Sequence, residues 1–341
     1  MSRIGQTLSH DARDRSIFEN SISKNLISKK TPNHKNGNAP MSPVKGRSFV
    51  KGGPRVSGRR TSALSAAAVL VLGGVSLAQA APADAPSAPD DKVLRVCAAN
   101  QPPLSLKDGT GLENRIASAV AEAMGRTAQF VWSDKPAIYL VRDSLDKKLC
   151  DVVVGLDTDD QRVLTTKPYY RSGYVFITRA DRDLDVKSWA DPRLKTIDHM
   201  VVGFGTPGEV MLKDIGRYEE DMAYLYSLVN FRAARNTYTQ IDPARMVSEV
   251  ANNKADVAVA FGPDVARYVK DSSQPLRMTL VPDDTTRSDG RKMPQSFDQS
   301  MGVRRDDEAL KTALDAAIVK AKPKIEAILK QDGVPVVPAT N

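Results

Sequence analysis

The chain has 341 residues and a net charge of +8, and 41% of its residues are hydrophobic. This length is more than one compact core usually needs, so it predicts two structural units. Residues 1–80 carry 13 Lys and Arg against 3 Asp and Glu, which leaves a net charge of −2 for the rest of the chain. Because a nucleic-acid-binding domain needs a basic face, this distribution excludes a nucleic-acid partner.

Residues 1–80 are typical of an N-terminal extension that ends in an export signal. Basic residues, including Arg59 and Arg60, precede the small and apolar stretch Ala63–Leu77, and an Ala-Gln-Ala motif follows that ends at Ala80. We expect cleavage near Ala80 and delivery to the periplasm, with a twin-arginine signal as an alternative route. No membrane insertion is expected after cleavage, since the apolar stretch is shorter than the roughly 20 residues of a spanning helix.

Cys97 and Cys150 are the only cysteines. An even number in an oxidising compartment favours one disulfide, which neighbouring parallel strands would bring together. Two separate buried thiols are the alternative. The sequence has no Cys-x-x-Cys motif, so redox catalysis and a zinc site lack support.

The first part of the folded chain alternates strands and helices after a linker rich in Ala, Pro and Asp at residues 81–92. The predicted elements are a strand at Val93–Cys97, a helix from Leu112 to Ala123 that Gly125 ends, a weak strand at Val131–Trp132, a helix that begins at Pro136 with Ile138, Val141, Leu145 and Leu149 on its apolar face, and strands at Val152–Leu156 and Tyr174–Thr178. This order predicts a doubly wound α/β sheet.

A second alternation of strands and helices follows, and then a long amphipathic tail. The predicted elements are strands at Val201–Phe204, Asp256–Phe261 and Met278–Val281, helices at Glu209–Ile215 and Ala244–Val250, and a tail helix at Asp307–Lys330 that Pro323 is expected to divide. Two architectures fit: two domains in series, or two lobes joined by crossing strands, with the tail returning to the first lobe.

Three segments resemble type II periplasmic solute-binding proteins: LRVCAANQPPLSLKDGTGLENRIASAVAEAMG, DVVVGLDTDDQRVLTTKPYYRSGYVFITR and MGVRRDDEALKTALDAAI. The resemblance covers about residues 93–335 and implies the second architecture, a bilobal fold of two doubly wound α/β lobes joined by a hinge. It implies lobe 1 at residues 93–178, lobe 2 at 179–298, and a return to lobe 1 at 299–338.

Three features resemble more narrowly the quinoprotein-dehydrogenase-associated branch of this family: the paired cysteines, TTKPYYRSGYVF and WADPRL…VVGFGTPGE. This resemblance implies a non-catalytic periplasmic accessory protein, without a cofactor of its own, for the PQQ-dependent methanol dehydrogenase system of methylotrophs. The implied partner is the large subunit of methanol dehydrogenase in its apo form. Calcium-system and lanthanide-system partners both stay open.

The resemblance also directs attention to Arg162, because in amino-acid-binding relatives the matching arginine clamps the ligand α-carboxylate. Asp157 stands close to where those relatives carry a hydroxyl, and Phe261 occupies the position of their amine-binding aspartate, with Asp264 three residues later. The amino-acid clamp is therefore only half present. Arg162 contacts a ligand or partner, or it forms an internal ion pair with a nearby aspartate (Asp157, Asp159 or Asp160).

Catalytic and cofactor motifs are weak in this sequence. His199 is the only histidine after residue 80, and we expect a structural or surface role for it. Residues 203–208 match GxGxxG, but no acidic residue follows at the spacing that nicotinamide binding requires. Gly205 and Thr206 are expected instead at a helix N-terminus that binds an anion or a partner carboxylate, or in a tight turn. An enzyme would need a paired acid and base, and Glu113, Asp157 and Glu209 are unpaired candidates.

Aromatic residues gather in two places, which favours either interfaces or cleft walls. One group, with Tyr169 and Tyr170, lies near the expected hinge, and the other contains Tyr224, Tyr226, Phe231 and Tyr238. A cleft lined in this way could hold an extended polypeptide. The alternative function is an extracellular solute-binding receptor of an ABC transporter for a small polar or carboxylate ligand.

Overall fold

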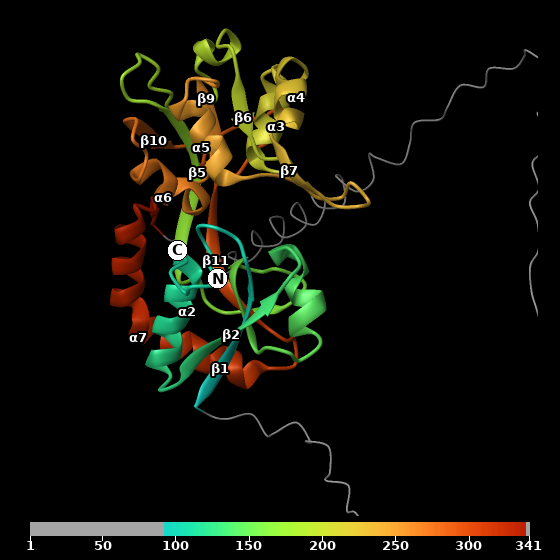
Figure 1. Cartoon of the computed structure of the whole chain (residues 1–341), viewed down its shortest axis with the longest axis vertical. Coiled ribbons are helices and arrows are strands. Elements are labelled where there is room, and N and C mark those ends of the chain that lie inside the picture. The colour runs from blue at the N-terminus through green and yellow to red at the C-terminus, as the bar shows by residue number, and fades with distance from the viewer. Residues whose placement is uncertain (1–91, 339–341) are drawn as a thin grey trace, which may run out of the picture. The chain divides into compact units, whose positions relative to one another are not determined.

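The computed structural model describes residues 92–338, so the expected signal peptide and most of the expected linker lie outside the described residues (Figure 1). The first lobe, as we use the term, comprises the elements from Val93 to Thr165 together with the C-terminal helix. Its elements are β1 (Val93–Ala99), α2 (Leu112–Ala123), β2 (Thr127–Ser133), η1 (Ala137–Tyr139), η2 (Val141–Leu145), β3 (Val152–Asp157), β4 (Leu164–Thr165) and α7 (Glu308–Asp332).

Parallel pairing of β1 with β2 and β3 forms the centre of the first lobe, as the alternation of strands and helices predicts. The apolar face of α2 is buried through Leu112, Ile116 and Val120. Gly125 follows in the left-handed conformation, with φ of +73°, and it ends the helix as expected.

The prediction of a regular helix after Pro136 was wrong. The segment forms the 3₁₀ turn η1 and then the single π turn η2, in which Val141 and Leu145 are buried. Lys148 then takes a left-handed backbone conformation, with φ of +59°, which stops the helical path. Leu149 follows this reversal and is 52% exposed, so it is not part of the buried face.

The second lobe comprises the elements between Pro192 and Leu280. They are η3 (Pro192–Lys195), β6 (Met200–Val202), α3 (Pro207–Asp214), α4 (Tyr218–Ser227), the hairpin strands β7 (Val229–Arg232) and β8 (Thr239–Ile241), α5 (Pro243–Ala251), β9 (Val257–Phe261), α6 (Gly262–Lys270) and β10 (Leu276–Leu280). The strand predicted at Val201–Phe204 ends earlier, because the Thr206 hydroxyl donates to the Gly203 carbonyl and turns the chain. The sequence analysis missed α4, α6 and the hairpin.

Two long strands, β5 (Tyr170–Arg179) and β11 (Ser296–Val303), connect the lobes and run side by side in Figure 1. The first half of β5 pairs antiparallel with β11, and its second half pairs with β9 and β10. Because β11 also pairs with β3, the chain enters the second lobe through β5 and returns through β11. This is the bilobal architecture, and two domains in series are excluded.

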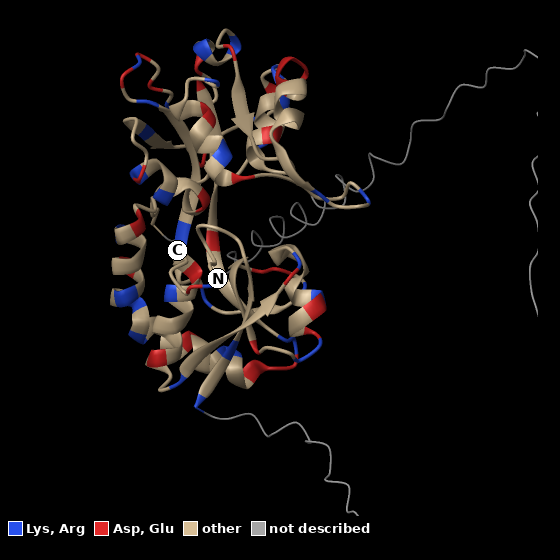
Figure 2. Ribbon diagram, in the orientation of Figure 1, with Lys and Arg blue, Asp and Glu red and all other residues tan. Residues whose placement is uncertain are grey.

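The described strands form one main sheet in the order β2-β1-β3-β11-β5-β9-β6, with β10 added to β5 and β4 to β11. Two large hydrophobic cores flank the connecting strands, one built around β1, α2 and α7 and the other around β6, β9 and α5, and a smaller core surrounds the two cysteines and η2. Acidic and basic residues are interspersed along both lobes in the view of Figure 2.

Pro323 does not divide the tail helix, contrary to expectation, and α7 packs as one helix against α2. Proline removes the hydrogen bond to the carbonyl four residues earlier, which belongs to Val319. Pro323 is exposed and Val319 is 68% exposed, so water can reach the Val319 carbonyl. A carbonyl that water can reach has a hydrogen-bond partner without the helix, so its loss costs less than that of a buried one.

The two cysteines form a disulfide, which decides between the two alternatives that the sequence left open. Cys97 lies in β1 opposite Val153 of β3, and Cys150 lies two residues before β3 begins. Their Cα atoms are 5.3 Å apart. In the part of the chain that the structure describes, no helix has the length and apolar character needed to cross a membrane.

Candidate functional site

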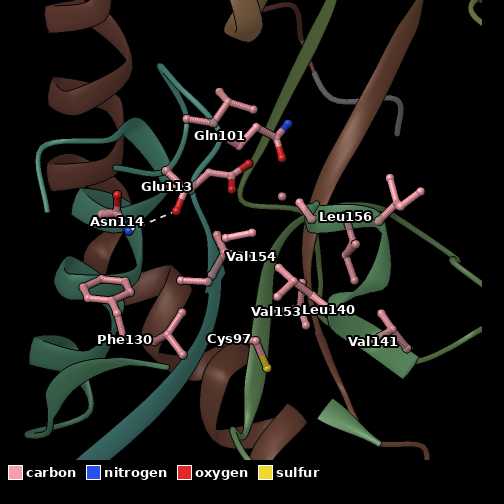
Figure 3. A pocket seen from close by; sticks show the side chains of 18 of the residues that line it. Cys97, Gln101, Glu113, Asn114, Phe130, Leu140, Val141, Val153, Val154 and Leu156 are labelled. Atoms are coloured by element: carbon pink, nitrogen blue, oxygen red, sulfur yellow. Dashed lines mark hydrogen bonds between the residues drawn. The ribbon is translucent and has the colours of Figure 1, made fainter. Parts of the chain in front are cut away.

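A pocket of about 210 Å³ lies in the first lobe, beside the carboxyl ends of β1 and β3 (Figure 3). Parallel α/β sheets place ligand sites at this end of their strands. Most of the wall is apolar, with Phe130, Leu140 and Val141 among its side chains. Its polar side chains are those of Gln101, Ser105, Glu113, Asn114 and Arg162. The pocket therefore joins an apolar wall to one acidic and one basic group.

Glu113, in the first turn of α2, lies directly over β3. Gly155 has a positive φ of +77°, which favours glycine, and a Cβ atom there would come within 1.8 Å of Glu113 Oε1 and force the carboxyl group to move. Burial raises the pKa of the Glu113 carboxyl to about 8, and the negative charge of Asp264 adds to the effect. The carboxyl is therefore mainly protonated at neutral pH.

Asp264 belongs to the second lobe, in the first turn of α6. Burial raises the pKa of its carboxyl to about 7, although the helix N-terminus favours a negative charge at this position. The negative charge of Asp264 contributes to the raised pKa of Glu113, after burial. The sequence analysis named Asp264 without assigning it to a site.

Tyrosines of β5 and its N-terminal neighbour lie next to these acids. The hydroxyl of Tyr169 accepts a hydrogen bond from the Gly155 amide at 3.0 Å, and its ring packs edge-on against Tyr170 at 5.1 Å. Burial raises the pKa of both tyrosines, and the negative charge of Glu113 contributes to both shifts. The two hydroxyl groups therefore keep their protons and can act as donors.

Arg162 forms an ion pair with Asp160, one of the alternatives open from the sequence. Nη2 and Nε of Arg162 lie 2.6 and 3.0 Å from the two carboxylate oxygens of Asp160. Burial opposes ionisation of Asp160, but hydrogen bonds from Arg162 outweigh it and hold the Asp160 pKa below its usual value. Arg162 is half exposed and still borders the pocket.

Asp157 and Phe261, the other candidates of the amino-acid clamp, lie near this site but make contacts within the chain. Asp157 ends β3 and accepts a hydrogen bond from the Gln299 amide of β11 at 2.7 Å. Phe261 precedes α6 and packs against Tyr174, with ring centroids 5.6 Å apart. The position that the resemblance matches to an amine-binding aspartate therefore carries an aromatic contact here.

Gly205 and Thr206 lie outside the pocket, at the start of α3. Thr206 Oγ1 accepts a hydrogen bond from the Glu209 amide, and Glu209 accepts one from the Gly205 amide at 2.6 Å. This arrangement is related to a capping box, but Glu209 reaches the amide of the residue before the N-cap Thr206. Because the chain's own side chains occupy these amides, the structure favours the tight turn over an anion site.

His199 and the second aromatic group form several small contacts. The His199 ring stacks on Tyr224 with centroids 4.2 Å apart, and its Nδ1 lies 3.2 Å from Asp221 Oδ1. Phe231 packs on Tyr238 within the hairpin. These contacts agree with a structural role for His199. Among the described residues, no group of three or more His, Cys, Asp or Glu side chains could hold a metal ion.

Comparisons with known proteins agree with this fold. The profile of the bacterial extracellular solute-binding proteins, family 3, matches residues 94–331. Protein MoxJ of Methylorubrum extorquens is 72% identical over 297 residues, which cover 84% of this chain and 99% of the relative. Protein MoxJ of Paracoccus denitrificans is 45% identical over 269 residues, 79% of this chain and 96% of the relative.

Two solved structures extend the comparison. MxaJ from Methlophaga aminisulfidivorans is 45% identical, with a TM-score of 0.68, and the match covers 72% of this chain and all of that one. The periplasmic binding protein XoxJ from Methylobacterium extorquens is 28% identical, with a TM-score of 0.54 and the same coverage. The chain therefore belongs to the bacterial extracellular solute-binding proteins of family 3.

Proposed function

We propose that this chain is a non-catalytic periplasmic accessory protein of the PQQ-dependent methanol dehydrogenase system, which binds the dehydrogenase and assists its maturation or activation. Identity of 72% to Protein MoxJ over nearly its whole length supports this proposal. The resemblance of TTKPYYRSGYVF and of the paired cysteines to the quinoprotein-dehydrogenase-associated branch supports it further. In this proposal, the signal peptide directs the chain to the periplasm and is removed near Ala80.

The observation that carries the proposal is the altered amino-acid clamp. A receptor for a free amino acid needs an arginine for the carboxylate and an acid for the amine. Here Arg162 is paired with Asp160, and Phe261 packs against Tyr174 where the resemblance places the acid. Both anchors of a free amino acid are therefore engaged in other contacts or replaced, which favours a different occupant of the cleft.

In the proposed mechanism, the lobes close on a segment of the dehydrogenase by bending of the two connecting strands, β5 and β11. The expected lobe boundaries near residues 178 and 298 fall on these strands. Extended segments bind through backbone hydrogen bonds and side-chain pockets, and tyrosines beside the cleft suit such contacts. Holding a segment in this way would keep the dehydrogenase open while its quinone or metal is loaded.

Calorimetric titration tests the proposal directly. The mature chain is titrated with methanol dehydrogenase from the same cells, in apo and loaded forms and from both the calcium and the lanthanide systems. We expect saturable binding that is tighter for an apo form. A family 3 amino-acid receptor of similar size is the control for nonspecific association.

Absence of binding to every form would overturn the accessory role. The alternative, a transporter receptor for a small polar or carboxylate ligand, would then be tested by thermal unfolding with a panel of metabolites. A true receptor is stabilised increasingly as the ligand concentration exceeds the dissociation constant.

A further inference from the structure

The C-terminal end of α7 joins the two lobes through one carboxylate. Asp332 is the last residue of α7 and is only 7% exposed. Its Oδ2 accepts a hydrogen bond from Arg115 of α2, in the first lobe, and another from Arg267 of α6, in the second lobe, at 2.8 Å. Ion pairs that are partly withdrawn from water are screened less than exposed pairs. Asp332 therefore links the lobes directly, in addition to the connecting strands.

Two further contacts hold α6 to the first lobe at the same place. The second bond of Arg267 Nη2 goes to the Thr110 carbonyl, just before α2, at 2.9 Å. Lys270, at the end of α6, donates to the carbonyl of Gln331 in the last turn of α7, which reaches α6 in Figure 1. The last carbonyls of a helix lack partners within it, so a lysine from outside satisfies one of them. Three side-chain contacts thus cross from α6 to the first lobe.

The chain continues from α7 into a segment that crosses the connecting strand β5. We call this segment, Gly333–Val337, the C-terminal strap. The Val337 amide donates to the Arg171 carbonyl of β5 at 3.0 Å. Ser172 of β5 pairs with the strap in an antiparallel bridge, and it also pairs with Phe297 of β11. Because a strand residue pairs on two edges, the strap covers the edge of β5 that β11 leaves open.

The strap packs against both lobes as it crosses β5. Val334 is 7% exposed and belongs to the hydrophobic core of the first lobe. Pro335 lies against Gly262, the first residue of α6, so closely that a Cβ atom on Gly262 would come within 2.6 Å of its Cγ. The Pro335 carbonyl also accepts a hydrogen bond from the Ser172 hydroxyl. The strap is therefore fixed to the first lobe, to β5 and to α6.

A second group of ion pairs near the hinge has a different position. Arg171 of β5 pairs with Asp298 of β11 at 3.2 Å and with Asp283 at 2.9 Å. Asp283 in turn accepts a hydrogen bond from the amide of Ser296, where β11 begins. These contacts join the connecting strands to each other, and they leave α6 free to move against α2 and α7. Control of the lobe orientation therefore falls to the contacts of Asp332 and of the strap.

We propose that the Asp332–Arg267 ion pair and the C-terminal strap form a latch that fixes the orientation of the two lobes. Rotation about β5 and β11 moves α6 relative to α2 and α7, which separates Arg267 from Asp332 and from the Thr110 carbonyl. An occupant of the cleft that requires another orientation must supply the free energy that breaks these contacts. The latch acts in the chain without any partner, so this inference is independent of the proposed function.

Distances between spin labels on the two lobes test the latch. The mature chain carries nitroxides at Lys147→Cys in the first lobe and at Ala223→Cys on α4, both at exposed positions, and labelling without reductant keeps the disulfide closed. Double electron–electron resonance then gives the distribution of interlobe distances. We expect one narrow peak for the labelled chain, and a peak at least twice as wide for Arg267→Gln and for a chain that ends at Asp332.

Arg115→Gln is the matched control, because Arg115 pairs with the same carboxylate but from within the first lobe. Its peak should be as narrow as that of the labelled chain. Thermal unfolding confirms that each variant is folded, and lost stability alone does not widen the distance distribution of a folded chain. Unchanged widths in both Arg267→Gln and the shortened chain would overturn the proposal, as would equal widening by Arg115→Gln. Widening in the shortened chain alone would overturn the role of the ion pair.

Discussion

Reduction of the Cys97–Cys150 disulfide should destabilise the first lobe. The two cysteines are 53 residues apart, and the loop that they close contains α2 and β2. Cross-linking a loop of this size removes conformational entropy from the unfolded chain and contributes about 4 kcal/mol to the free energy of unfolding. Both side chains are buried, so reduction changes the cross-link without exposing the sulfur atoms in the folded state.

The two tryptophans allow the effect to be measured in each lobe. Trp132 lies in β2, inside the closed loop, and Trp189 packs against Phe176 in the core of the second lobe. Urea unfolding is followed by fluorescence in Trp189→Phe, which reports on Trp132, and in Trp132→Phe, which reports on Trp189. Reduction should lower the free energy of unfolding by about 4 kcal/mol at Trp132 and by less than about 1 kcal/mol at Trp189.

A Cys97→Ala/Cys150→Ala variant controls for other effects of the reductant, because it should not respond to it. A change below about 1 kcal/mol at Trp132 on reduction would refute the cross-link argument. Equal losses of unfolding free energy reported by Trp132 and Trp189 would refute the prediction that the destabilisation is confined to the first lobe.

Three further predictions concern the acids and the glycine of the site. Burial raises the Glu113 pKa to about 8, so the free energy of unfolding should fall as pH rises from about 4.5 to about 8. Urea titrations at pH 5 and pH 9 measure this loss of stability, and Glu113→Gln should remove about 2 kcal/mol of it. A pH profile that Glu113→Gln leaves unchanged would contradict the argument. Gly155→Ala should lower the free energy of unfolding by about 1 to 2 kcal/mol, measured by thermal unfolding, because alanine is strained at this positive φ; a neutral result would contradict the strain argument. Asp332→Ala should cost about 3 kcal/mol in urea unfolding, since Arg115 and Arg267 both pair with this carboxylate, whereas Asp332→Asn should cost less.

Local patterns in the sequence determined most of the regular elements. The apolar run at Val152–Leu156 can be buried on both faces only as a strand, and the structure has a strand there. The helical spacing from Leu112 to Ala123 places its apolar residues on one face only in a helix, and the structure has a helix there. Such patterns extend over a few residues, so they predict secondary structure without tertiary information. The same reasoning failed after Pro136 and at Pro323, where one left-handed residue and one exposed face decided the outcome.

Tertiary structure alone decided the arrangement of the candidate site. Insertion of β11 between β3 and β5 joins segments that are far apart in the sequence, and hydrophobic pattern does not specify such pairing. Glu113 and Arg162 were candidates from the sequence, but the ion pair of Arg162 with Asp160 and the effect of the Asp264 charge on the Glu113 pKa depend on how the chain folds back. The sequence determined which chemical groups this protein carries, and the fold determined which of them became partners, because burial and charge act through space.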